Sequence, residues 1–186
     1  MSRIAPLDPK TAPAPAKALL DAVQAQLGVT PNFIRVLAQS PKALEGFLGL
    51  YGAAGGFAIH KATQERIALA VAEGNRGQYC VSAHTPTGRH AGLSNEKMAL
   101  NRRGSSGEAR AEAVVAFAKA LNGNLGEVTT AEFDAARNAG LTDGEIVEII
   151  AVVALNIFPN VLGKATRVEI DFPKVSLFDG AAKAAA

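Results

Sequence analysis

Apolar residues recur along most of the chain with the period of an α-helix. In one segment they are spaced three or four positions apart, as a single buried helical stripe requires: Ala111, Val114, Val115, Ala118 and Leu121. Alternation of apolar and polar residues, which would indicate strands, is scarce. The pattern predicts one all-α domain over residues 1–186, a compact bundle of about seven or eight helices with no sheet.

Signals for helix ends agree with this pattern. Thr142 is followed three residues later by Glu145, which is the spacing of a capping box, and Gly140 stands where a helix C-terminus is expected. Proline-rich sequence predicts an extended N-terminal arm over about residues 1–14. A C-terminal tail is expected over about residues 171–186.

The most apolar stretch runs from Ile146 to Phe158. Its apolar residues lie on more than one side of a helix, which is typical of a helix central to the domain or partly covered by another subunit. A membrane-spanning helix needs about 20 apolar residues. Because this stretch is shorter and contains Glu148, we expect no membrane span.

Composition narrows the classes of function. The 186 residues carry a net charge of +2, include no Trp and are 5% aromatic, so no surface for nucleic acid is expected. The single cysteine excludes internal disulfides and multi-cysteine zinc modules and fits a reducing compartment. Because no apolar leader follows Met1, the expectation is a soluble, cytoplasmic protein.

The cysteine lies in the most informative segment, residues 63–92. Gly74 and Gly77 interrupt the helical pattern, and a second helix is expected to begin near Tyr79 and Cys80, which places Cys80 in a first helical turn. His84 follows four residues later on the same helix face. A helix N-terminus and a neighbouring imidazole both lower the pKa of a thiol below its usual value of about 8.5. The arrangement predicts a thiolate that reacts with a peroxide or a disulfide.

Other interpretations of these residues stay open. A lone cysteine in a helical protein is often a small buried apolar residue. Glu65 is a third candidate because it could orient or protonate His84 from the preceding helix, or it is a solvated helix charge. His60 and His90 are expected near helix ends. Since His84 and His90 are six residues apart, they lie on different helix faces, and no metal site is expected.

The spacing of these residues resembles the motif of the alkyl hydroperoxidase D-like, or carboxymuconolactone decarboxylase-like, family. That motif is Glu, eleven residues, Cys-x-x-Cys, three residues and His, and the chain has Glu65, Gly77, Cys80 and His84 at these positions. The likeness extends over roughly residues 5–173. Further segments resemble the peroxidase-related branch of the family: residues 28–33, 73–75, 79–80, 83–85, 156–160 and 169–173.

The resemblance implies an AhpD-like all-α fold that assembles through its helices into dimers, trimers or hexamers. It also implies thiol-dependent reduction of hydroperoxides, in which the second motif cysteine attacks and the first forms the resolving disulfide. By this likeness Cys80 is the attacking thiol, His84 its acid/base partner and Glu65 the relay carboxylate. The implied partners are a hydroperoxide or another small molecule, an external thiol reductant and further copies of the chain. No cofactor is expected.

The chain departs from the motif at Gly77, where the family has its first cysteine. With no other cysteine, an intramolecular disulfide cannot form. Three accounts remain open: an external thiol resolves a sulfenic acid on Cys80, the redox activity has been lost while the pocket is kept, or the glycine is an introduced substitution. Gly77 also suits a helix break that has no functional role.

Three functions are therefore compared. The first is an antioxidant thiol peroxidase that uses Cys80 with Glu65 and His84 as a proton relay. The second is a non-redox, decarboxylase-like enzyme in which Glu65 and His84 perform acid–base chemistry on a small lactone or acid. The third is a catalytically inactive family member that works through oligomer contacts or ligand binding.

Overall fold

A computed structural model describes residues 2–179 of the chain. Within this range the polypeptide forms nine α-helices and no β-strand, so the all-α prediction is confirmed. More helices form than the seven or eight expected, because a helix as short as α2, with six residues, shows less than two turns of the 3.6-residue period. The helices are α1 (Ala14–Leu27), α2 (Asn32–Leu37), α3 (Pro41–Ala54), α4 (Lys61–Gly74), α5 (Gln78–His90), α6 (Asn95–Arg102), α7 (Ala109–Gly123), α8 (Thr130–Asn138) and α9 (Asp143–Thr166).

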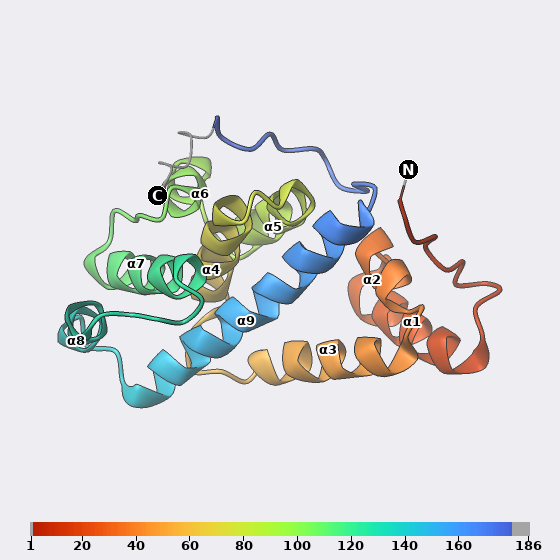
Figure 1. The fold of residues 1–186 in the computed structure, drawn as a ribbon, viewed down its shortest axis with the longest axis horizontal. Coiled ribbons are helices and arrows are strands. Elements are labelled where there is room, and N and C mark those ends of the chain that lie inside the picture. Colours follow the sequence, from red (N-terminus) through yellow and green to blue (C-terminus); the bar gives the residue numbers. More distant parts are fainter. Residues whose placement is uncertain (1, 180–186) are drawn as a thin grey trace.

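Helix α4 lies at the centre of the bundle, where it contacts α5, α6, α7 and α9. Figure 1 shows α9 crossing the molecule between this group and a second group formed by α1, α2 and α3. One apolar cluster includes Leu20 and Leu44 in the second group, and another includes Val71 of α4 and Ile149 of α9. The pocket described below lies where the two groups meet.

Local signals end several helices as predicted. Thr142 forms a capping box at the start of α9, because its hydroxyl accepts the N–H of Glu145 and its own N–H donates to the Glu145 carboxylate. Gly140 has a φ of +81°, a left-handed conformation that glycine adopts without strain. These short-range interactions fix the turn between α8 and α9.

Helix α9 is 24 residues long and extends well beyond the apolar stretch seen in the sequence. By length and composition alone it could cross a membrane, which corrects the expectation that this segment is too short. One side of the helix packs on α3, α4 and α7, as in a core helix. The other side exposes four large apolar residues: Val147, Ile150, Phe158 and Val161.

The described residues before α1 and after α9 lie along the helices. Residues 2–13 form no helix, and within them the N–H of Leu7 donates to the Arg35 carbonyl. After α9 the chain runs beside α5, where the N–H of Val175 donates to Ser82 Oγ. Of the expected tail, residues 180–186 lie outside the described residues.

Candidate active site

Cys80 is the third residue of α5 and therefore lies in the first helical turn, as predicted. Gly77 is the N-cap of this helix. His84 follows one turn later, and its side chain shares the face of α5 that carries Cys80. Both side chains line the same pocket, so the local helix geometry brings the thiol and the imidazole to one place.

Burial controls the ionisation of the thiol. Cys80 is 4% exposed, and burial raises the pKa of its thiol to about 12. The prediction of a lowered pKa is therefore wrong, because lost hydration destabilises the thiolate more than the helix N-terminus stabilises it. In the described part of the chain no hydrogen bond joins Cys80 to His84. The free protein thus holds a neutral thiol at neutral pH.

Glu65 on α4 holds the ring of His84. Oε2 of Glu65 lies 2.8 Å from His84 Nδ1 and accepts a hydrogen bond of 2.8 Å from Thr87 Oγ1, while Oε1 lies 3.1 Å from Lys61 Nζ. Burial disfavours the carboxylate, but the charge and hydrogen bond of His84, followed by Lys61 and Thr87, outweigh it and lower the pKa of Glu65 to about 2. Glu65 is a buried, ionised partner of His84 and not a solvated helix charge.

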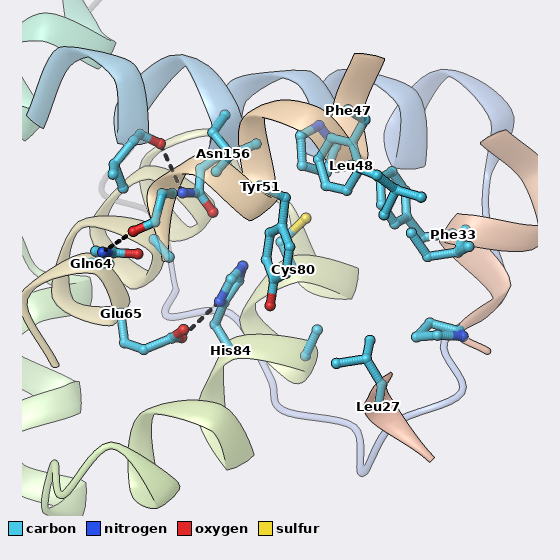
Figure 2. A pocket seen from close by; sticks show the side chains of 18 of the residues that line it. Leu27, Phe33, Phe47, Leu48, Tyr51, Gln64, Glu65, Cys80, His84 and Asn156 are labelled. Carbon is cyan, nitrogen blue, oxygen red and sulfur yellow. Dashed lines mark hydrogen bonds and ion pairs between the residues drawn. The ribbon is translucent and has the colours of Figure 1, made fainter. Parts of the chain in front are cut away.

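The three residues lie along a pocket of about 360 Å³. In Figure 2 the ring of His84 lies between Glu65 and Cys80. The rest of the wall is largely apolar and aromatic and includes Phe33, Phe47, Leu48, Tyr51, Leu155 and Phe172. Such a pocket suits a small apolar molecule whose reactive atom approaches the sulfur.

Four polar residues around this site were not recognised in the sequence. Lys61 lies one turn before Glu65 on α4, so its i, i+4 spacing was a usable signal. Thr87, Gln64 and Asn156 carry no comparable signal. Only the packing of α4, α5 and α9 brings their polar atoms to the site.

Gly77 leaves no room for a side chain. A Cβ at this position would lie 1.9 Å from Oδ1 of Asn160, a residue that is 2% exposed and donates its Nδ2–H to the Asn156 carbonyl. Real Cβ atoms essentially never approach so closely, so a larger residue at position 77 requires Asn160 to move. Gly77 and Asn160 therefore fit each other in the packed fold.

The other histidines lie at helix ends, as expected. His60 is the N-cap of α4, and His90 is the last residue of α5. Over residues 2–179 no group of three or more His, Cys, Asp or Glu side chains is arranged to hold a metal ion. The chemistry available at this site is that of the thiol, the imidazole and the carboxylate.

The fold and the pocket define an all-α protein in which one cysteine and a histidine–glutamate pair share an apolar cavity. The model of the carboxymuconolactone decarboxylase family matches residues 41–122, from the start of α3 into α7. This match confirms the resemblance found in the sequence to the alkyl hydroperoxidase D-like, or carboxymuconolactone decarboxylase-like, family.

Solved structures share the fold over most of the chain. An uncharacterized peroxidase-related protein from Ralstonia eutropha JMP134 with an AhpD core is 24% identical, with a TM-score of 0.80 and coverage of 91% of this chain and 92% of that one. One from Silicibacter sp. TM1040 is 23% identical, with a TM-score of 0.77 and coverage of 89% and 91%. The debrominase Bmp8, in complex with 2,3,4-tribromopyrrole, is 21% identical, with a TM-score of 0.78 and coverage of 92% of each chain. The comparison with curated proteins gives no significant match.

Proposed function

We propose that this protein is a one-cysteine thiol peroxidase that reduces organic hydroperoxides. The observation that carries the proposal is that Cys80 lines the same apolar pocket as His84, whose ring is held by the ionised carboxylate of Glu65. The peroxidase-related names of two solved neighbours support this reaction class.

The first step oxidises the thiol and reduces the hydroperoxide. Sγ of Cys80 attacks the terminal peroxide oxygen, so an S–O bond forms while the O–O bond breaks. The products are a sulfenic acid on Cys80 and an alcohol, and the thiol proton ends on the departing alkoxide. His84 carries this proton, because Nδ1 is bound to Glu65 while the other ring nitrogen faces the pocket (Figure 2).

The raised pKa of Cys80 makes this base essential. A thiol with a pKa of about 12 is neutral at rest, so the nucleophilic thiolate forms only as His84 takes the proton. The negative charge of Glu65 stabilises the resulting imidazolium. The His84–Glu65 pair therefore supplies the base that the buried, neutral Cys80 thiol needs in order to react.

An external thiol completes the cycle, because Cys80 has no partner cysteine in the chain. One molecule of the thiol attacks the sulfenic acid and gives a mixed disulfide and water. A second molecule regenerates the Cys80 thiol and leaves as the oxidised dimer of the reductant. This requirement fits a reducing compartment, and we place the protein in the cytoplasm.

Trapping with dimedone tests the proposal. The reduced protein is treated with one equivalent of cumene hydroperoxide, then with dimedone, and analysed by peptide mass spectrometry. We expect one label on Cys80, no label in Cys80→Ser and slower labelling in His84→Gln. A folded protein whose Cys80 remains an unmodified thiol would overturn the proposal.

The similarity to a debrominase supports a second candidate, thiol-dependent removal of bromine from a small aromatic ring. Here Sγ of Cys80 takes the bromine, the carbon–bromine bond breaks, and the ring carbon receives a proton. Two external thiols then reduce the S–Br bond, which releases bromide and H⁺ and regenerates the Cys80 thiol, and they leave as their disulfide. The aromatic wall formed by Phe33, Phe47 and Tyr51 favours this candidate. Release of bromide from a bromopyrrole, without peroxide reduction, would identify it.

We also propose that the chain forms a homo-oligomer through the outer face of α9. Val147, Ile150, Phe158 and Val161 repeat at helical spacing on this face and are between 41% and 64% exposed. A contiguous exposed apolar face of this kind is typical of a protein–protein contact. A second copy is the proposed partner, as in the oligomers that the family resemblance implies.

A further inference from the structure

Two buried amide side chains, Gln64 on α4 and Asn156 on α9, reach the pocket. They are 9% and 6% exposed, and both line the cavity. Nε2 of Gln64 donates to the carbonyls of Ala54 and Ile59 at 2.9 and 3.0 Å. Nδ2 of Asn156 donates to the Val152 carbonyl at 2.8 Å.

These bonds determine which end of each amide faces the cavity. Turning either amide round would place its oxygen against a backbone carbonyl oxygen, so the nitrogen must face the backbone. Oε1 of Gln64 and Oδ1 of Asn156 are therefore left toward the pocket, and within residues 2–179 neither accepts a hydrogen bond. Both oxygens stay accessible from the cavity, since among the described residues the fully buried side-chain acceptor without a partner is Asn160 Oδ1. An apolar ligand that covers them would remove their contact with water, so a ligand that supplies a donor binds more tightly.

The two oxygens and the aromatic wall lie at different parts of the cavity. In Figure 2 Gln64 and Asn156 lie on one side of His84, while Phe33 and Phe47 lie on the other. Phe33 and Phe47 meet edge to face, with ring centroids 5.2 Å apart. A volume of about 360 Å³ is near the lower end for ligand pockets, which suits a molecule of one or two rings.

The charges of the wall favour a neutral ligand. Lys61 is the fixed cation among the described lining residues, and its Nζ is already 3.1 Å from Oε1 of Glu65. An anionic ligand would meet the ionised Glu65 and the two amide oxygens without a free positive charge. A neutral ring with an N–H or O–H group meets no such repulsion.

We propose that the pocket binds a small, neutral aromatic molecule whose N–H or O–H group donates to Oε1 of Gln64 and Oδ1 of Asn156. Its ring packs against the aromatic wall, which leaves the reactive position of the molecule near Sγ of Cys80. For the proposed peroxidase, this molecule is the organic part of the hydroperoxide. This inference rests on the proposed function only in taking Cys80 as the residue that reacts with the bound molecule.

Two isomeric probes test the hydrogen bond with the unaltered protein. 3-Methylindole has a free N–H, whereas 1-methylindole has the same size and apolar character but no donor. By isothermal titration calorimetry we expect 3-methylindole to bind about tenfold more tightly, the effect of one buried hydrogen bond. Equal affinities for the two isomers, or tighter binding of indole-3-carboxylate than of 3-methylindole, would overturn the proposal.

Variants of Gln64 and Asn156 test whether these two amides cause the tighter binding of 3-methylindole. Asn156→Leu and Gln64→Met remove the acceptors with little change in volume, and each should reduce the tenfold preference to about twofold or less. Leu48→Met, on the apolar wall, is the matched control and should keep the preference. A preference that persists in both amide variants contradicts the assignment.

Binding and peroxide chemistry can fail separately. If 3-methylindole is preferred but cumene hydroperoxide leaves Cys80 unlabelled by dimedone, the ligand class stands and the peroxidase proposal is wrong. If Cys80 is labelled while the two isomers bind equally, the peroxidase proposal stands and the ligand class is wrong.

Discussion

The side-chain oxygen of Asn160 occupies the space in which a Cβ at Gly77 would lie, 1.9 Å from its ideal position. Gly77 is the N-cap of α5, three residues before Cys80, and Asn160 belongs to α9. Asn160 Oδ1 is buried, and no donor in the described part of the chain reaches it. The start of the helix that carries the thiol is thus packed directly against α9, in the place where the family motif has its first cysteine.

Gly77→Cys, which restores that motif, should destabilise the protein by about 1–3 kcal/mol because it overpacks the contact with Asn160. Urea unfolding measures the loss. Gly49→Ala on α3 is the control, since nothing lies within 4 Å of its new Cβ, and it should be neutral or stabilising. Adding Asn160→Ala to Gly77→Cys should recover stability. A Gly77→Cys protein as stable as the original contradicts the steric account.

The buried thiol should alkylate slowly at neutral pH. Because burial raises the pKa of Cys80 to about 12, the rate with iodoacetamide should rise about tenfold for each pH unit from 7 to 10. Mass spectrometry of the alkylated peptide follows the reaction, and urea-unfolded protein supplies the reference rate. A rate that levels off below pH 8 would mean that the thiolate is stabilised in the fold.

Loss of the Glu65 charge should change how stability depends on pH. The pKa of Glu65 is lowered from 4.5 to about 2, so its ionised form stabilises the fold above pH 4.5 and this contribution is lost as pH falls toward 2. Glu65→Gln should cost about 3 kcal/mol near neutral pH and flatten the pH dependence between 4.5 and 2. Glu45→Gln removes an exposed ion pair with Lys42 and should change neither the stability near neutral pH nor its pH dependence.

Thr87 should act as a positioning residue through Glu65. Thr87→Val removes the 2.8 Å hydrogen bond to Oε2 of Glu65 and should slow sulfenic acid formation on Cys80 by about tenfold. It should also raise the pKa of Glu65, which the pH profile of the reaction detects. Thr87→Ser keeps the hydroxyl and should restore the rate. Failure of the serine variant to do so points to a packing role instead.

Charges on the outer face of α9 should dissociate the proposed oligomer. Val147→Glu combined with Val161→Glu places two carboxylates in the exposed apolar face and should shift the protein to monomers, as measured by light scattering after size exclusion. Leu125→Glu is the control, because Leu125 is 94% exposed and lies in the segment between α7 and α8, outside α9. An unchanged mass in the α9 variant would exclude this interface.

Much of the fold was predictable because its signals are local. The capping box of Thr142 and Glu145, the helical period of residues 111–121 and the start of α5 before Cys80 each depend on neighbours a few positions apart. Helix α2 was missed because six residues show less than two turns of the period. The full length of α9 was missed because it continues beyond the most apolar residues.

Only the part of the site that depends on spacing along one helix was predictable from the sequence. The spacing of Cys80 and His84 already placed them on one face of α5, and the family motif brought in Glu65. The spacing did not indicate Gln64 and Asn156, whose side chains reach the same pocket through the packing of α4 against α9. The pKa of Cys80 was predicted in the wrong direction, since the helix terminus is a local effect and burial is a global one.

The sequence alone determined the all-α class, the ends of most helices and the presence of one thiol with an imidazole one turn away, because these follow from contacts within a few residues along the chain. The tertiary structure decided that the thiol is neutral, that Glu65 is buried and ionised, and that position 77 has no room for a side chain. The ionisation of Cys80 and Glu65 depends on which helices exclude water from them, and the space at position 77 depends on the side chains packed around it. Both are set only when the helices assemble.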